Sequence, residues 1–218
     1  MPSAMSQYWE QVDAMSHLVA YLLLMMSLLS WYTILSKTWS LWRVRRAAPS
    51  LAAFWKAPTL QDAVALLAFA DKEEIFAPMA RQGIAATDPA GRALTLNAGD
   101  ASSQVLTRVL RQEMNQATVK LEAGLTLLAS IGATAPFVGL LGTVWGIYHA
   151  LAAVAGSGTV QIDRVAGPVG EALIMTALGL MVAIPAVLAY NAFNRMNRIM
   201  LAEVDAFAYD LHAHLTKS

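Results

Sequence analysis

Three long stretches of the chain contain almost no charged residues. Residues 18–36 and 124–155 hold no Asp, Glu, Lys or Arg, and residues 165–194 hold one, Glu171. A helix needs about 20 predominantly apolar residues to cross the hydrocarbon core of a bilayer. Each stretch reaches that length, so the pattern predicts three membrane-spanning helices.

The segment between the first two stretches has the periodicity of helices separated by turns. Thr59 is a good capping residue and precedes an apolar-periodic run, so a helix is predicted over 60–68. A second short helix is predicted over 73–85. Turn-forming residues at 87–91 and 97–100 predict two breaks in the chain.

Two of the spans are expected to continue as helices beyond the bilayer. Apolar residues recur at helical spacing from residue 101 without an apparent breaker, so we expect one helix over 101–155. At roughly 1.5 Å per residue it would be about 80 Å long, far more than the bilayer thickness. The same spacing after residue 195 predicts an extension of the third span. The connection at 156–164 is short, so spans two and three should form an antiparallel hairpin.

The composition supports a membrane protein. Apolar residues make up 57% of the 218 residues and charged residues 14%, whereas soluble domains average about 45–50% and about 25%. The alternative is a soluble protein with an unusually large core, but the remaining segments are too short to cover three such helices on all sides. We therefore expect an all-α membrane protein with three transmembrane helices and long cytoplasmic extensions of helices 2 and 3.

The charge balance and the residue types exclude several classes of function. Lys and Arg total 15 and Asp and Glu total 15, so no global basic field is available to hold nucleic acid. The chain has no cysteine, which removes disulfides, thiolate metal sites and cysteine nucleophiles. The HExxH, GxSxG and GxxxxGKS/T motifs are absent from the sequence. We expect no enzyme activity, no catalytic residue, no metal site, no cofactor and no nucleic-acid partner.

Basic residues set the expected orientation. Residues 1–17 contain no Lys or Arg, which argues against a signal peptide because its leading region is basic. The basic residues that follow the first and third stretches are Lys37, Arg43, Arg45, Arg46, Arg195 and Arg198. By the positive-inside rule the N-terminus is outside and the C-terminus is inside. The expected order is a periplasmic N-terminus at 1–17, transmembrane helix 1 at 18–36, a cytoplasmic helical domain at 37–123, transmembrane helix 2 at 124–155, a periplasmic loop at 156–164, transmembrane helix 3 at 165–194 and a cytoplasmic C-terminal helix at 195–218.

Glu171 is the principal candidate functional residue. An ionised carboxylate is costly in hydrocarbon, so such a group tends to be protonated, paired or in contact with water, and it marks a functional site by default. The alternative is a charge at the membrane interface, because Glu171 lies only about two turns inside the third span. His149, at a similar expected depth, could pair with Glu171 or lie at the interface itself.

Thr143 and Thr176 are equally far from the middle of the connecting loop, so an antiparallel hairpin places their hydroxyls at one depth. Thr176 lies about 7 Å deeper along the helix than Glu171. The carboxyl and the two hydroxyls form a candidate track for protons or water, although five residues turn a helix by about 140°. The alternative for each threonine is a hydrogen bond to the carbonyl four residues earlier.

Small residues and prolines occur along the second and third spans. Membrane helices associate through close packing of small residues, so Gly139, Gly142 and Gly146 are predicted packing positions. Pro136 and Pro185 lack an amide donor and predict kinks. Because small residues surround both helices, we expect an oligomer or a packed partner helix.

The residues around these positions resemble those of a known family. Residues 129–147 read ASIGATAPFVGLLGTVWGI, and residues 165–180 read VAGPVGEALIMTALGL, followed by AIPAV at 183–187. They resemble the second and third spans of the ExbB/TolQ group of proton-channel subunits, and their amino-acid sequence is more similar to ExbB than to TolQ. The related MotA subunit has four spans, one more than is predicted here.

The resemblance implies a bacterial inner-membrane protein that forms a pentamer, whose second and third spans surround a pair of helices of the single-span protein ExbD. Inward proton flow would drive TonB, which opens outer-membrane transporters for iron chelates and vitamin B12. Thr143, Glu171 and Thr176 match polar pore positions of the family, whereas the main proton-carrying aspartate belongs to ExbD. The alternatives are a TolQ-type subunit that energises envelope integrity and a purely structural membrane scaffold with Glu171 at the interface.

Overall fold

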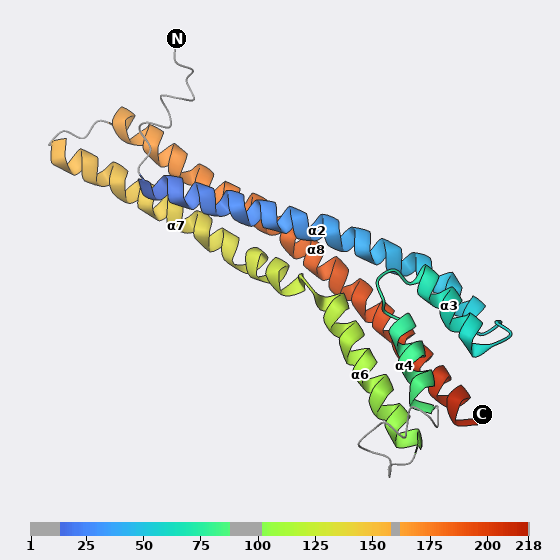
Figure 1. Cartoon of the computed structure of the whole chain (residues 1–218). Helices are drawn as coiled ribbons and strands as arrows, with labels where there is room; N and C mark the ends of the chain where they lie inside the picture. Colours follow the sequence, from blue (N-terminus) through green and yellow to red (C-terminus); the bar gives the residue numbers. More distant parts are fainter. Residues whose placement is uncertain (1–13, 88–101, 158–161, 218) are drawn as a thin grey trace. The chain divides into compact units, whose positions relative to one another are not determined.

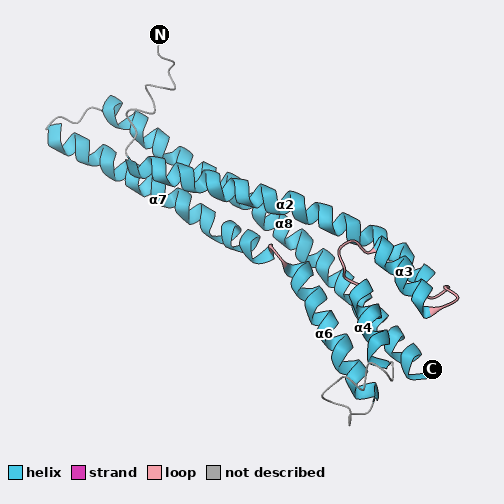
Figure 2. Cartoon of the chain, in the orientation of Figure 1, coloured by secondary structure: helices cyan, strands magenta, loops and turns pink. Residues whose placement is uncertain are grey.

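The computed structural model describes residues 14–87, 102–157 and 162–217, and within these ranges all regular structure is helical (Figure 2). The helices, shown in Figure 1, are α2 (Ala14–Phe54), α3 (Leu60–Ala70), α4 (Ala77–Thr87), α6 (Ser102–Glu122), α7 (Leu125–Ser157) and α8 (Ile162–Lys217). The prediction of an all-α chain is confirmed for the described residues.

Three helical segments are long and apolar enough to cross a membrane. They are Ala14–Phe54, Ser103–Ala152 and Ala166–Lys217. Each overlaps one of the three predicted spans, so the candidate membrane helices agree with the sequence prediction. The helical pattern expected after residue 195 is also confirmed, because α8 runs without interruption to Lys217.

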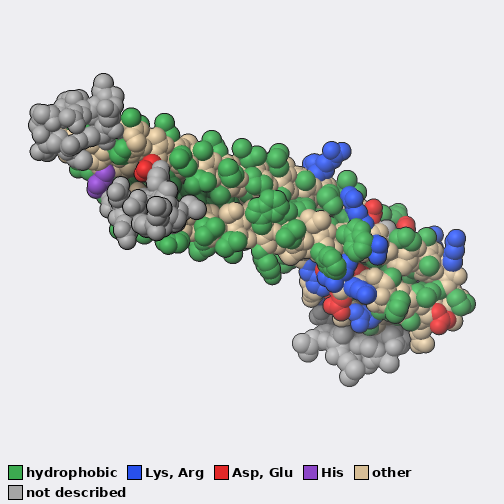
Figure 3. All heavy atoms as spheres, turned by 90° about the horizontal axis from the view of Figure 1, so that it is seen from above, with side chains coloured by type: hydrophobic (Ala, Val, Ile, Leu, Met, Phe, Trp, Pro, Cys, Tyr) green, Lys and Arg blue, Asp and Glu red, His purple; other side chains and the backbone are tan. Residues whose placement is uncertain are grey.

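The chain divides into two compact units, which we describe separately. Met1–Leu35 and Gly124–Ala192 form the first, called the apolar unit, and Ser36–Ala123 and Phe193–Ser218 form the second, called the charged unit. In Figure 3, hydrophobic side chains cover most of the visible described surface of the apolar unit, and Lys, Arg, Asp and Glu side chains gather on the charged unit. The two units therefore have different surface chemistry.

Large apolar side chains of the apolar unit point outward. Tyr32 of α2, Phe137 of α7 and Met181 of α8 are 73%, 70% and 67% exposed. Extensive apolar surface of this kind marks a membrane or protein interface. The small residues Ala135 of α7 and Ala186 of α8 are fully buried instead. This arrangement is typical of helices that pack through small side chains in a lipid environment.

The charged unit has a core of aromatic and aliphatic side chains. The ring centroid of Phe207 of α8 lies 5.3 Å from that of Phe54 of α2 and 5.8 Å from that of Phe76. A Cβ placed on Gly83 of α4 would lie 3.2 Å from Cδ2 of Leu211 of α8. Helices α2, α4 and α8 therefore share one core within this unit.

Local hydrogen bonds explain where α3 and α4 begin. The amide of Asp62 donates to Thr59 Oγ1 at 3.1 Å, so Thr59 caps α3 as predicted. The second short helix begins four residues later than the predicted range 73–85. The reason is that the amide of Ala77 donates to Asp71 Oδ2 at 2.8 Å, so the Asp71 carboxylate sets the first turn of α4.

The prediction of one helix over 101–155 is wrong. Helix α6 ends at Glu122 and α7 begins at Leu125. Gly124 between them has a φ of 82°, a left-handed conformation that glycine adopts without steric strain. A single glycine therefore interrupts the helical hydrogen bonding where the apolar periodicity continues.

Side chains of the charged unit bind the last carbonyls of α6. Lys37 Nζ donates to the Lys120 carbonyl at 3.2 Å, and Asn197 Nδ2 donates to the Leu121 carbonyl. The last carbonyls of a helix have no partner within it, so these two donors replace the missing ones. Lys37 lies just beyond the apolar stretch, and its burial lowers the pKa of the ammonium, while nearby acidic side chains such as Glu73 raise it.

The connection between α7 and α8 is shorter than the predicted range 156–164, because α7 continues to Ser157 and α8 begins at Ile162. The residues that predict the ends of this loop are therefore helical. The predictions that lie outside the described residues concern 1–13, 88–91, 97–100 and 158–161.

Candidate functional site

Helices α7 and α8 approach each other closely at two glycines. A Cβ placed on Gly139 would lie 2.6 Å from the Met175 carbonyl oxygen, and a Cβ on Gly179 would lie 2.7 Å from the Ala135 carbonyl oxygen. The neighbour is a backbone atom in both cases, which cannot move aside without shifting its helix. Any larger residue at either position would therefore separate the two backbones.

The other two predicted packing glycines of α7 also have close neighbours. A Cβ on Gly142 would lie 3.0 Å from Val19 Cγ1 of α2 and 3.1 Å from Met175 Cβ of α8. A Cβ on Gly146 would lie 2.9 Å from Ala172 Cβ of α8. Helices α2, α7 and α8 thus meet around Gly142.

This close approach brings Thr143 and Thr176 together. Their Oγ1 atoms form a hydrogen bond between α7 and α8, and Thr143 Oγ1 also donates to the Gly139 carbonyl at 3.1 Å. A hydroxyl has one proton, so Thr143 uses its own on Gly139 and Thr176 is the donor within the pair. Thr143 therefore makes both bonds that the sequence offers it. It donates to the carbonyl four residues earlier, and it is bonded to Thr176 of the neighbouring helix.

The two threonines differ in exposure. Thr143 is 7% exposed, whereas Thr176 is half-buried. Because Thr176 is the donor of the pair, its oxygen lone pairs remain free to accept a proton donor such as water or a protonated carboxyl. The contact therefore presents one hydroxyl oxygen of α8 as an acceptor.

Glu171 lies on α8 beside the contact with α7. Its neighbour Ala172 is buried against Gly146, while Glu171 itself is half-buried. Among the described residues Glu171 makes no ion pair and no side-chain hydrogen bond. The structure therefore brings the two threonines together but does not bond Glu171 to either of them, in agreement with the angular offset expected from the sequence.

The two prolines lie inside helices. Pro136 is within α7 and Pro185 within α8, and both are half-buried. His149 is exposed, and its ring centroid lies 4.9 Å from that of Trp145 and 5.6 Å from that of Tyr148. His149 is thus part of an aromatic group on α7.

Two buried polar residues of the first span were not predicted from the sequence. Ser30 is 1% exposed and Thr33 is 7% exposed, so both point into the apolar unit. Thr33 Oγ1 donates to the Leu29 carbonyl at 2.7 Å, whereas Ser30 Oγ has no hydrogen-bond partner among the described residues. The signal available in the sequence was their spacing of three residues, which places both on one face of the helix.

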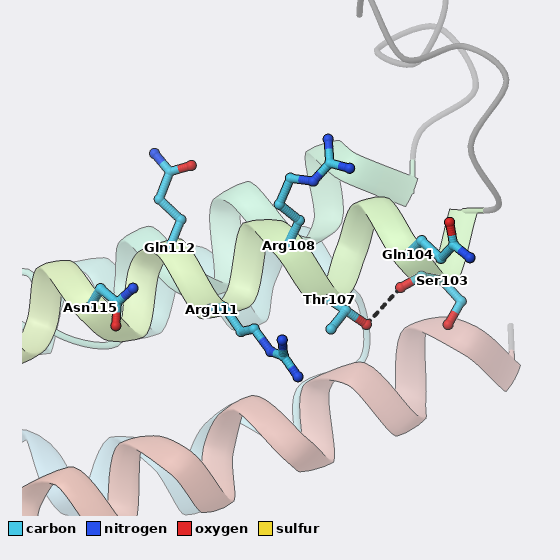
Figure 4. A pocket seen from close by; sticks show the side chains of 7 residues that line it. All are labelled: Ser103, Gln104, Thr107, Arg108, Arg111, Gln112 and Asn115. Atoms are coloured by element: carbon cyan, nitrogen blue, oxygen red, sulfur yellow. Dashed lines mark hydrogen bonds between the residues drawn. The ribbon is translucent and has the colours of Figure 1, made fainter.

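The described part of the charged unit has several open surface depressions. A surface depression is lined by residues of α6 alone, among them Ser103, Thr107, Arg108 and Arg111 (Figure 4). Thr107 Oγ1 donates to the Ser103 carbonyl at 2.7 Å, and Arg111 points toward α8 while Arg108 points away. The described residues also contain no cluster of three His, Asp or Glu that could hold a metal ion.

The three apolar helices, with a polar contact between two of them, are typical of a multi-pass membrane protein. The family described as the MotA/TolQ/ExbB proton channel family matches residues 71–206, a range that includes Thr143, Glu171 and Thr176. The chain belongs to this family, and it is a multi-pass membrane protein.

Individual relatives indicate which members of the family the chain is similar to. The chain is 46% identical over 204 residues to the biopolymer transport protein ExbB of Xanthomonas campestris pv. campestris (strain B100), and the aligned region covers 91% of this chain and 81% of the relative. It is 40% identical over 206 residues to the biopolymer transport protein ExbB of Neisseria meningitidis serogroup B, with 90% of each chain covered. It is also 40% identical over 116 residues to the Tol-Pal system protein TolQ of Pseudomonas aeruginosa, with 53% of this chain and 50% of the relative covered. The chain is thus a biopolymer transport protein of the ExbB/TolQ family.

Proposed function

We propose that this chain is an ExbB-type stator and proton-channel subunit of the bacterial inner membrane. With an ExbD-like single-span protein it couples the proton motive force to a TonB-like protein, and so to outer-membrane transport of iron chelates and vitamin B12. The observation that carries the proposal is the Thr143–Thr176 hydrogen bond between α7 and α8, with half-buried Glu171 on the same apolar helix. A helix pair that only anchors a protein in lipid has no need of these polar groups, which are costly there.

The proposed channel role assigns a separate task to each polar residue. Glu171 is the one acidic group in the apolar stretch of α8, so it is the group of this chain that can take up and release a proton. Thr143 and Thr176 line the route, and Thr176 supplies an acceptor oxygen for water. The main proton carrier of the complex would be an aspartate of the single-span partner.

The proposed assembly is a homopentamer around the helices of the single-span partner. Support comes from the large apolar side chains that remain exposed on both channel helices, among them Leu140 of α7 and Leu173 of α8, which are 50% and 58% exposed. These side chains are available for contacts with neighbouring subunits, with partner helices and with lipid. The first span has many exposed apolar residues as well, and we assign it to the lipid side.

The proposed orientation has the N-terminus in the periplasm and the charged unit in the cytoplasm. It rests on the basic residues that follow the first and third apolar stretches and on their absence from residues 1–17. In this orientation protons enter from the end of the membrane where Glu171 lies, because Glu171 is close to the start of α8. The carboxyl would then act before the threonine pair along an inward path.

The test is a Glu171→Gln variant in a strain that lacks the chromosomal copy. Glutamine keeps the size and polarity of the side chain but carries no exchangeable carboxyl proton. We expect energy-dependent uptake of a ferric chelate to be abolished, while the amount of protein in the membrane and its co-purification with the single-span partner stay at wild-type level. The matched control is Glu113→Gln on α6, which should transport normally. Normal uptake by the Glu171→Gln variant would refute the channel role and favour the structural scaffold.

A TolQ-type role is the second candidate. It is favoured by the TolQ relatives, which match at identities similar to those of the ExbB relatives but over at most about half of the chain. A deletion strain separates the two. Loss of iron-chelate uptake with normal detergent resistance supports the ExbB-type role, and detergent sensitivity with normal uptake supports the TolQ-type role.

A further inference from the structure

The four basic residues that follow the first apolar stretch divide into two pairs. Lys37 is 6% exposed and donates to the Lys120 carbonyl, and Arg43 forms an ion pair with Glu73. These two cations are therefore used inside the charged unit. Arg45 and Arg46 are exposed, and neither pairs with a carboxylate within the described part of the chain.

The exposed pair shares one face of α2 with two tryptophans. The opposite, inward face consists of Leu41, Val44 and Ala47, which are 1%, 2% and 1% exposed. The outward face consists of Trp39, Trp42, Arg45 and Arg46, which we call the Trp–Arg face. Trp39 and Trp42 are 61% and 48% exposed, so about half or more of each indole remains uncovered.

A cation–π contact fixes one of the two arginines. The Arg46 guanidinium carbon lies 3.6 Å from the centroid of the Trp42 ring. Arg46 follows Trp42 by four residues, so its side chain points back toward the apolar stretch, in the direction in which helical side chains lean. The guanidinium is therefore held at the level of Trp42, about 9 Å along the helix from Ser36, the last residue of that stretch.

That level lies at the outer edge of the phospholipid headgroup layer. The hydrocarbon core is about 30 Å thick and the bilayer with its headgroups about 40–45 Å, so the headgroup layer extends roughly 5–8 Å on each side. Tryptophan is enriched in this layer, and guanidinium groups bind phosphate through paired hydrogen bonds. A surface with two partly exposed indoles and two guanidinium groups that make no ion pair within the described part of the chain matches an anionic phospholipid.

We propose that the Trp–Arg face is a binding site for anionic phospholipid headgroups, in which Trp39 and Trp42 enter the interface and Arg45 and Arg46 contact the phosphates. The partner is the membrane itself, because the apolar stretch of the same helix ends only three residues before Trp39. The site goes beyond proton conduction, and it anchors α2 whichever cargo the complex serves.

The test measures lipid retained by the full-length chain. The protein is purified in detergent, incubated with equal amounts of phosphatidylglycerol and phosphatidylcholine, and analysed by native mass spectrometry. We expect the wild type to retain phosphatidylglycerol in preference to phosphatidylcholine. Arg45→Gln with Arg46→Gln should lower phosphatidylglycerol retention by about fivefold for each arginine removed, the effect of one basic residue near an anionic surface.

Matched variants separate a site from a general charge effect. Arg108→Gln with Arg111→Gln removes the same charge from α6 and should leave retention unchanged. Trp42→Leu should weaken retention although both arginines remain, because Arg46 loses its stacking partner. Each variant must keep the wild-type elution volume and helical circular dichroism, so that misfolding is recognised.

Three outcomes would overturn the assignment. The first is unchanged phosphatidylglycerol retention in the Arg45/Arg46 variant, and the second is an equal loss in the α6 control. The third is unchanged retention together with loss of an acidic partner protein that co-purifies with the wild type, which would assign the face to a protein partner. Loss of iron-chelate uptake has no bearing on these lipid measurements, so the channel proposal and the lipid site fail independently.

Discussion

Thr176 donates its hydroxyl proton to Thr143 across the contact between α7 and α8. The direction follows from the second bond of Thr143, which donates to the Gly139 carbonyl at 3.1 Å. The two hydroxyls, which have the same chemistry, are therefore in different states. Thr143 is buried and both donates and accepts a hydrogen bond. The oxygen of Thr176 can still accept a hydrogen bond from another group.

The first prediction concerns the hydroxyl of Thr176. Thr176→Val keeps the shape of the side chain but removes both the donor to Thr143 and the acceptor lone pairs. We expect ferric-chelate uptake to fall about twofold to tenfold or slightly more, which corresponds to the loss of one hydrogen bond of about 0.5–1.5 kcal/mol. Thr176→Ser keeps the hydroxyl and should retain near wild-type uptake. Equal uptake by the valine and serine variants would show that the hydroxyl has no part in transport.

The second prediction concerns the glycines that allow α7 and α8 to approach. Gly179→Ala places a methyl group 2.7 Å from the Ala135 carbonyl oxygen, so the helices must separate. Overpacking of this kind costs about 1–3 kcal/mol, and the thermal midpoint in detergent should fall by about 2–4 °C for each kcal/mol. The measurement is helix loss followed by circular dichroism.

Gly170→Ala is the matched control on the same helix. A Cβ on Gly170 has no atom within 4 Å among the described residues, and alanine favours a helix over glycine by about 1 kcal/mol. The control should therefore be as stable as the wild type or slightly more so. If both variants melt alike, the backbone contact at Gly179 does not limit stability.

The third prediction tests the orientation of the chain. Because the sequence has no cysteine, a single introduced thiol can be labelled without background. We expect Ala14→Cys to react with a membrane-impermeant maleimide in intact spheroplasts, since the proposed orientation puts the N-terminal end of α2 outside. Ser103→Cys on α6 and Thr216→Cys at the end of α8 should react only after the membrane is permeabilised. The reverse labelling pattern would show that the chain has the opposite orientation in the membrane.

The fourth prediction concerns the end of α6. Asn197→Ala removes the donor to the Leu121 carbonyl and leaves that buried acceptor unpaired, which costs about 1–3 kcal/mol. We expect a lower thermal midpoint and faster proteolysis near residue 123, where α6 ends. Asn194→Ala on the same helix is the control, because Asn194 is exposed. Identical cleavage patterns for both variants would rule out a stabilising role for Asn197.

Much of this architecture follows from two physical rules that act on the sequence. Charges are excluded from hydrocarbon, so gaps in the charge pattern located the three candidate membrane helices. An antiparallel hairpin places residues equally far from its loop side by side, so counting from the loop brought Thr143 and Thr176 together. Both rules depend only on residue type and position, which the sequence contains in full.

The features that escaped prediction depend on single local interactions. Gly124 interrupts an apolar pattern that otherwise continues, and its left-handed conformation cannot be recognised from periodicity. The start of α4 depends on the Asp71 carboxylate, which binds an amide six residues later. The burial of Ser30 depends on which face of α2 meets its neighbours. In each case the deciding contact is tertiary or conformational, and a pattern of apolar and polar residues does not contain it.

The direction of the Thr176–Thr143–Gly139 hydrogen bonds also limits how protons can travel. A proton wire works only if every member hands one proton on and receives another, and the Gly139 carbonyl has none to hand on. The two hydroxyls and the carbonyl therefore cannot relay a proton from one helix to the other. In the proposed channel, protons at this depth would therefore pass along the exposed side of Thr176, carried by water or a partner carboxyl, and the threonine pair would be a fixed polar edge of the route.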